Sequence, residues 1–184
     1  MTLIGHRARN HPQQVAKRGQ NRDVDDRATT AEDFAPLDRR FGGFTIDVAA
    51  DTHNTKCARF YDLEVDGLAQ SWAGERVWCN PPYSTIAPWV AKAWAEHRAA
   101  ELIVMLLPAN RTEQVWWRDL VEPYRDRPGS TLSTEFLFGR MRFMAAGQTS
   151  IGPNERPPFG CVLLIWQAAE YRPEPTLLTM EEAR

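Results

Sequence analysis

The chain has 184 residues, of which 43% are hydrophobic and 25% charged, values typical of one globular domain. Its apolar runs, such as 102–107, are much too short to cross a bilayer, and the first residues, MTLIGHRARN, lack the apolar stretch of a signal peptide. These features exclude a membrane-spanning protein, and three scattered cysteines without a CxxC pair favour a reducing cytoplasm over secretion.

The net charge of −2 is unevenly distributed. Residues 1–22 contain five basic residues and no acid, which leaves −7 on the other 162 residues. We therefore expect a flexible basic segment over 1–25, a folded domain over 26–170 and a polar tail over 171–184. The basic segment suits contacts with nucleic-acid phosphates, and it equally suits a solvated tail that aids solubility.

Helical and extended patterns alternate in the first half of the chain. We expect, in chain order, a helix over 31–41 and strands over 44–49, 60–65 and 76–79. Thr29 and Thr30 can cap the helix, and Pro36 shortens or bends it. The last of these strands must stop at Pro81 and Pro82, because two consecutive prolines cannot donate ladder hydrogen bonds.

The same alternation continues in the second half. We expect a helix over 86–100, a strand over 102–107, a helix over 110–121, and strands at 136–138, 141–144 and 161–166. Trp89, Ala93 and Trp94 form an apolar stripe at helical spacing on the first of these helices. Asn110 and Glu113 have the spacing of a capping box for the second.

Continuous apolar strands separated by helices predict an α/β fold, with a mostly parallel sheet and helices on both faces. The later strands follow one another without helices, which predicts an antiparallel edge. Ligands of such sheets bind at the carboxyl ends of the strands. Asp47 and Asn80 both fall at expected carboxyl ends, so they are the first candidate site residues.

The tetrapeptide Asn80-Pro81-Pro82-Tyr83 follows a buried strand and carries the clearest chemical signal. The Asn80 side-chain oxygen and the Pro81 carbonyl can accept both hydrogens of an exocyclic amine. The prolines hold these acceptors in one geometry, and Tyr83 offers a flat face for stacking on a planar base. The alternative is an ordinary turn, because Asn and Pro are common turn formers.

The run FGGFTIDVAADTHNTKCARFYDLEVDGLAQSWAGERVWCNPPYS, residues 41–84, resembles the phage-type DNA N6-adenine methyltransferases, the small Dam-like family. The resemblance continues through LLPANRTEQVWWRDLV and FLFGRMRF to CVLLIW, so it covers about 140 residues. It implies the Rossmann-like S-adenosylmethionine-dependent methyltransferase fold. The tetrapeptide NPPY alone is less specific, since protein-glutamine and RNA-guanine methyltransferases also contain it.

The resemblance implies four cofactor-binding residues. Asp47 and Ala49 match the family's first cofactor loop, and Asp66 matches an acid that accepts from the adenine amine of the cofactor. Thr29 resembles the Thr of a Trp-x-Thr-Pro element that holds the carboxylate end of the cofactor. The sequence departs from that element, with Arg27 at the Trp position and Thr30 at the Pro position. The alternative for Asp47 is a strand-ending Asp that caps the next turn. The alternative for Asp66 is an ordinary turn, since Asp-Gly is a common turn pair.

A late family segment includes Arg140, Arg142 and Phe143. The two arginines are candidates for DNA phosphates, and Phe143 is a candidate for the second face of the target base. The alternative is an edge hairpin with solvated arginines and a core Phe.

The resemblance therefore implies S-adenosylmethionine-dependent methylation of N6 of a flipped adenine in double-stranded DNA, without a metal. It places the protein in the cytoplasm, that of a bacterial host if it is encoded by a phage or prophage. The length leaves no room for a large target-recognition domain of the restriction-modification kind. The alternatives are an RNA or protein-glutamine methyltransferase, and an inactive nucleic-acid-binding relative.

Overall fold

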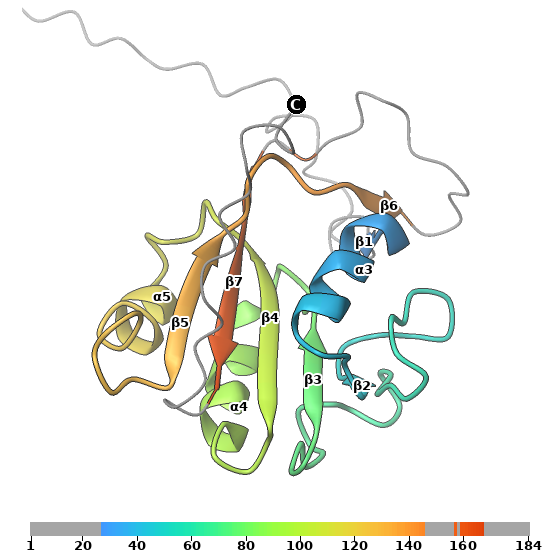
Figure 1. Ribbon diagram of the computed structural model, residues 1–184, viewed down its shortest axis with the longest axis horizontal. Coiled ribbons are helices and arrows are strands. Elements are labelled where there is room, and N and C mark those ends of the chain that lie inside the picture. The colour runs from blue at the N-terminus through green and yellow to red at the C-terminus, as the bar shows by residue number, and fades with distance from the viewer. Residues whose placement is uncertain (1–26, 146–156, 158, 168–184) are drawn as a thin grey trace, which may run out of the picture.

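The computed structural model describes residues 27–145, 157 and 159–167, and Figure 1 shows their arrangement around one sheet. The five strands lie in the order β2-β3-β4-β7-β5. They are β2 (Ile46–Asp47), β3 (Arg76–Cys79), β4 (Leu102–Pro108), β7 (Cys161–Trp166) and β5 (Leu132–Phe136). The expected basic segment over 1–25 and the expected tail over 171–184 lie outside the described residues.

The strand directions make the sheet mixed. β2, β3 and β4 are parallel, whereas β7 is antiparallel to both of its neighbours, β4 and β5. The predicted antiparallel edge is confirmed, but the sheet is half antiparallel rather than mostly parallel. The reason is that β7 is inserted between β4 and β5, so the edge contributes two antiparallel pairings in place of one.

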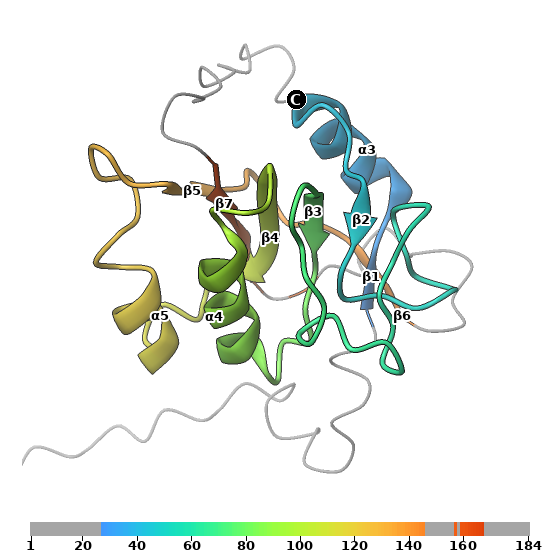
Figure 2. The same cartoon turned by 90° about the horizontal axis from the view of Figure 1, so that it is seen from below.

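Helices cover both faces of this sheet, as predicted. They are α3 (Ala31–Arg40), α4 (Ile86–Glu96) and α5 (Val115–Leu120). Figure 2 shows α3 on one side of the sheet and α4 with α5 on the other. The side chains of strand β4 alternate between two hydrophobic clusters, one on each face of the sheet. Val104 and Leu106 pack with residues of α3. Met105 and Leu107 pack with residues of α4 and α5, so both faces of the sheet must be covered by helices. Every residue of β4 is buried, which accounts for its continuous apolar sequence.

Tryptophans fill much of the core on the α4 side. Trp72 and Trp166 are fully buried, and Trp94 packs edge-on against Trp166 with ring centroids 5.8 Å apart. Trp116 and Trp117 of α5 are also buried, with their rings 5.8 Å apart. Six of the seven tryptophans of the chain therefore pack in or against this part of the core.

Several predicted boundaries were wrong for local reasons. The strand expected at 60–65 is reduced to a bridge between Phe60 and Asp47. The Asp62 carboxylate accepts the N–H groups of Glu64 and Val65, and this turn competes with extended structure. The expected capping box is also absent: α5 begins after Gln114, whose N–H donates to the Arg111 carbonyl in a turn.

Other boundaries shift by a few residues. The Thr30 hydroxyl caps α3 by accepting the Asp33 N–H at 3.1 Å, and Pro36 is accommodated within that helix. Helix α4 ends at Glu96 rather than residue 100, strand β2 covers only two of the six residues expected, and β4 includes Pro108.

A separate two-stranded ribbon was not predicted. β1 (Arg27–Thr29) pairs antiparallel with β6 (Phe143–Ala145), which places Thr29 opposite Phe143. The strand expected at 141–144 therefore joins a segment far away in the sequence instead of the main sheet. Among the described residues, no helix is long and apolar enough to span a membrane.

Candidate functional site

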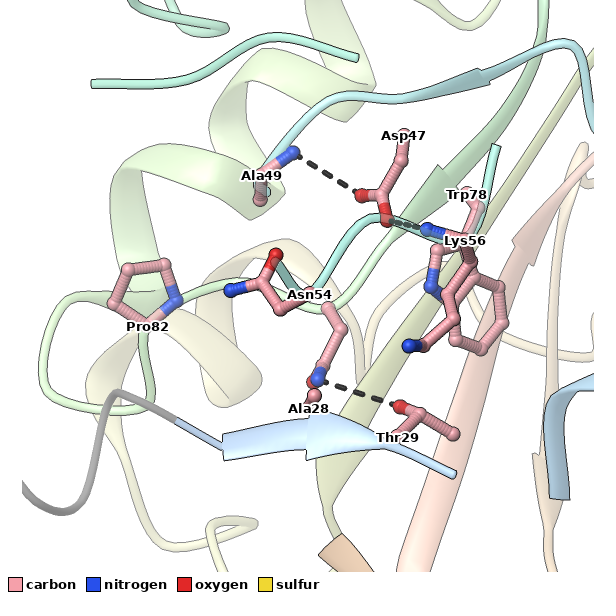
Figure 3. A pocket seen from close by; sticks show the side chains of 9 residues that line it. Ala28, Thr29, Asp47, Ala49, Asn54, Lys56, Trp78 and Pro82 are labelled. Atoms are coloured by element: carbon pink, nitrogen blue, oxygen red, sulfur yellow. Dashed lines mark hydrogen bonds between the residues drawn. The ribbon is translucent and has the colours of Figure 1, made fainter. Parts of the chain in front are cut away.

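The loops that follow β2 and β3 meet at one edge of the sheet, because these neighbouring strands are parallel. Asp47 is the last residue of β2, and Asn80 follows the last residue of β3. A cavity of about 50 Å³ lies between the two loops and the ribbon (Figure 3). It is lined by Ala28, Thr29, Asp47, Ala49, Asn54, Lys56, Trp78, Asn80 and Pro82.

Asp47 organises the first wall of this cavity. Its carboxylate accepts the N–H groups of Lys56 at 3.0 Å and Ala49 at 3.4 Å. A second acid, Asp51, accepts the N–H groups of His53 and Asn54 at 2.7 and 2.9 Å. The two aspartates thus hold residues 47–56 in a compact loop. Asp47 stabilises the turn after its strand, as the structural alternative expected, and it also lines the cavity.

Burial changes the acid–base properties of two cavity residues. Asp47 is 3% exposed, and desolvation raises its pKa to about 6, although the two backbone N–H groups and the charge of Lys56 act in the opposite direction. Burial also lowers the pKa of Lys56, against the attraction of Asp47. The cavity therefore holds a carboxyl group that titrates close to neutral pH.

The raised pKa of Asp47 predicts a pH-dependent contribution to stability. Because the folded protein binds this proton more tightly than the unfolded chain, the contribution is complete below about pH 4 and is lost as the pH rises through about 6. We expect the free energy of unfolding of the wild type, relative to Asp47→Asn, to fall by about 1–3 kcal/mol between pH 4 and pH 7. Urea unfolding of both proteins at several pH values measures this. A difference that stays constant with pH would contradict the prediction.

The second wall comes from the NPPY segment and the ribbon. Asn80 Nδ2 donates to the hydroxyl of Thr29 at 3.4 Å, and Thr29 is 1% exposed. The Tyr83 ring packs edge-on against Phe143, with centroids 6.2 Å apart, and against Phe159 at 6.1 Å. The ribbon therefore contacts both ends of the tetrapeptide.

Cys79, which precedes Asn80, is turned away from the cavity. It packs in the core on the α4 side, while its neighbour Trp78 packs on the α3 side. Complete burial holds the pKa of the Cys79 thiol well above its usual value. A thiolate nucleophile at this position is excluded by the same burial.

The structure gathers only some of the residues singled out in the sequence. Thr29, Asp47, Ala49, Asn80 and Pro82 line the cavity, whereas Pro81 and Tyr83 adjoin it through the tetrapeptide. Asn54, a candidate for shaping the cofactor turn, also lines the cavity, and the lining residues that the sequence did not single out are Ala28, Lys56 and Trp78. The alternation of Trp78 with Cys79 on a buried strand was the available signal for Trp78, but no local pattern marks Lys56.

Asp66 lies outside the cavity, in an exposed turn with a left-handed φ of 56°. Its carboxylate accepts the Leu68 N–H at 3.1 Å. The next residue, Gly67, touches the first loop: a Cβ at this position would lie 2.0 Å from the Val48 carbonyl oxygen. Asp66 is therefore adjacent to the Asp47 loop through the backbone.

The three candidate DNA-binding residues, Arg140, Arg142 and Phe143, differ in their surroundings. The Arg142 guanidinium forms an ion pair with Glu32 at 2.5 Å, and Phe143 is only 7% exposed. Arg140 is exposed, and within the part of the chain that the structure describes no carboxylate pairs with it. Arg140 is thus the one of the three with its charge presented to solvent.

The polar groups around the cavity suit one end of a charged organic ligand. The cavity is small, about 50 Å³, and partly open, so a larger molecule would place only an end group of a few atoms there. Asp47 supplies a carboxylate, Lys56 an ammonium group, and Thr29 and Asn80 supply neutral polar groups. These residues fit the amino acid end of a cofactor such as S-adenosylmethionine.

Comparisons with known proteins point to one family. A family model described as DNA N-6-adenine-methyltransferase (Dam) matches residues 17–182. A protein of Escherichia phage T1, named DNA N-6-adenine-methyltransferase, is 37% identical over 86 residues, which are 46% of this chain and 36% of the phage protein. A protein of the same name from Haemophilus phage HP1 is 35% identical over 80 residues, 42% of this chain and 44% of that protein. The chain thus matches less than half the length of either relative.

Proposed function

The chain belongs to the DNA N-6-adenine-methyltransferase (Dam) family, and from this we propose that it transfers a methyl group from S-adenosylmethionine to N6 of adenine in double-stranded DNA. We also propose that its α/β core is the Rossmann-like methyltransferase fold. The single observation that carries the proposal is the meeting of Asn80 with Asp47 at the carboxyl edge of parallel strands.

The tetrapeptide would hold the reacting amine. The Asn80 side-chain oxygen and the Pro81 carbonyl would accept the two N6 hydrogens, which directs the nitrogen lone pair toward the methyl donor. The bond from Asn80 Nδ2 to Thr29 favours this orientation of the amide, because it directs the nitrogen end toward the ribbon. Pro82 limits the motion of the loop, so the acceptors are positioned before the substrate binds.

The adenine must leave the duplex to reach these groups. Tyr83 would stack on the flipped base, and Phe143, edge-on to Tyr83, would support that ring or contact the base itself. S-adenosylmethionine supplies an electrophilic methyl group on its sulfonium sulfur. The role of the protein in this step is alignment of the amine with that methyl group.

The cofactor would lie across the first loop. We propose that Asp47, Ala49 and Thr29 contact its amino acid end, and that Asp66 accepts from its adenine amine. The contact of Gly67 with Val48 supports this path, since it keeps Asp66 next to the loop that lines the cavity. A ligand that extends from the small cavity along this loop would pass from Asp47 toward Asp66.

A transfer assay tests the proposed function. The purified protein is incubated with methyl-labelled S-adenosylmethionine and, separately, with unmethylated duplex DNA, RNA or a protein extract. We expect label in DNA, recovered as N6-methyladenine after hydrolysis. Label confined to RNA or to glutamine would favour a methyltransferase of another substrate class, and cofactor binding without transfer would favour an inactive relative.

We propose that Arg140 contacts a DNA phosphate near the active site. Leu137 donates its N–H to the Cys161 carbonyl, and Cys161 pairs with Pro108 at the carboxyl end of β4. Arg140 follows shortly after this point, so it leaves the sheet at the same edge as Asn80. Arg142 is a weaker candidate, because Glu32 already neutralises its charge.

Arg140→Gln is expected to weaken duplex DNA binding about 3- to 10-fold near 0.1 M salt and to lower the slope of log K against log salt by about one. Arg142→Gln should have a smaller effect. Arg98→Gln is the matched control, since Arg98 is exposed just beyond α4, at the opposite edge of the sheet. Fluorescence anisotropy over a salt series measures all three. An equal loss for Arg98→Gln would assign the effect to net charge alone.

A further inference from the structure

Lys56 is the basic residue of the cavity. Its backbone N–H donates to Asp47, and its half-buried side chain lines the same space as Thr29 and Asn80. In Figure 3 the Lys56 side chain extends from the first loop toward the Thr29 side of the cavity. The ammonium group is therefore directed into the site rather than along the outer surface.

The half-buried ammonium group of Lys56 has no direct ion-pair partner among the residues that the structure describes. Asp47 is nevertheless close enough to affect its pKa. Lys92 differs: its ammonium pairs with Glu96 at 2.7 Å. Partial burial of a charge is costly without a compensating group, so the position of Lys56 suits an anion that arrives with a ligand.

The two charges in the cavity are opposite and separate. Asp47 presents a carboxylate on the loop side, and Lys56 presents an ammonium group toward the ribbon. A ligand end with both an ammonium and a carboxylate group complements this pair better than a phosphate does, because a phosphate would be repelled by Asp47.

We infer that Lys56 binds the carboxylate of the amino acid end of S-adenosylmethionine, opposite Asp47, which binds its ammonium group. This inference rests on the proposed function and adds a residue that the sequence did not single out. Thr29, on the ribbon side, would then donate to the same carboxylate. No covalent step is involved, so Lys56 acts in binding and orientation.

The test combines a protein variant with a ligand variant. Isothermal calorimetry measures the binding of S-adenosylhomocysteine and of its analogue without the carboxylate to the wild type and to Lys56→Met. For the wild type, removal of the ligand carboxylate should weaken binding about 10- to 100-fold. Lys56→Met should lose a similar factor for S-adenosylhomocysteine and little or nothing for the analogue, because the two deletions remove the same contact.

Lys92→Met is the matched control, since it removes a half-buried lysine that is ion-paired on α4. It should change the two affinities by less than about twofold, whatever its effect on the melting temperature. Lys56→Arg should retain part of the affinity, because it keeps the charge. If Lys56→Met does not fold, Lys56→Gln replaces it, and the same comparison of both ligands with the wild type and the variant decides the role of Lys56.

The outcomes separate this inference from the proposed function. Equal losses for both ligands, or no loss for Lys56→Met while the wild type binds S-adenosylhomocysteine, would overturn the role of Lys56 and leave the methyltransferase proposal intact. A reduced salt dependence of DNA binding with unchanged S-adenosylhomocysteine affinity would assign Lys56 to a phosphate instead. A wild type that binds neither ligand would overturn both proposals.

Discussion

Asn80→Ala is expected to reduce methyl transfer to adenine by at least about 100-fold, a loss of roughly 3 kcal/mol or more of transition-state stabilisation. The variant removes the side-chain acceptor for one N6 hydrogen, so the amine is no longer oriented as its lone pair attacks. Binding of S-adenosylhomocysteine should stay within about threefold of the wild type, because the charged groups of the cavity, Asp47 and Lys56, remain in place.

Single-turnover methylation of duplex DNA and calorimetric binding of S-adenosylhomocysteine measure the two quantities. Asn110→Ala is the matched control, since Asn110 is an exposed asparagine in the loop after β4 and lies outside the cavity lining. It should retain transfer within about threefold. Full transfer activity in Asn80→Ala would contradict the proposed role of the tetrapeptide, and loss of transfer together with loss of cofactor binding would point to a disrupted cavity instead.

Gly67→Ala is expected to destabilise the fold by more than about 3 kcal/mol. The new Cβ would lie 2.0 Å from the carbonyl oxygen of Val48 and 3.2 Å from its carbonyl carbon. Both atoms belong to the backbone directly after β2, so no side chain can rotate away to relieve the contact. The Gly67 carbonyl also accepts the indole N–H of the fully buried Trp72 at 2.9 Å, and a shift of this segment would weaken that bond.

Gly74→Ala separates this packing effect from backbone strain. Gly74 has a positive φ of 72°, and nothing lies within 4 Å of a Cβ added there. Its replacement should cost only about 1–2 kcal/mol, through the left-handed conformation alone. Urea unfolding of the two variants gives the comparison. A smaller loss for Gly67→Ala than for Gly74→Ala would show that the loop after β2 adjusts freely.

The strands that were predicted best are those buried on both faces. Residues 76–79 and 161–166 form strands with the predicted bounds, because helices cover both sides of the sheet and every position except Arg76 is buried and apolar. The positions of Asp47 and Asn80 at strand ends followed from the same pattern. Periodicity and composition were therefore sufficient to place two candidate residues at one edge of the sheet.

The remaining features depend on contacts that no local pattern reveals. The ribbon joins Thr29 to Phe143, and neither of its three-residue strands has a periodic sequence of its own. Lys56 enters the cavity because Asp47 accepts its N–H from across a turn. The strand expected at 60–65 failed because Asp62 satisfies the backbone locally, a competition that β propensity does not describe.

The ribbon has a consequence for the recombination of related chains. One of its strands supplies Thr29, which contacts Asn80, and the other supplies Phe143, which contacts Tyr83. Consider a chimaera that takes residues 27–29 from one parent and residues 143–145 from another parent of different sequence. Its two ribbon strands would no longer match each other, and the contacts of the ribbon with Asn80 and Tyr83 would both be disturbed. The two segments should therefore be exchanged together, although most of the described domain lies between them.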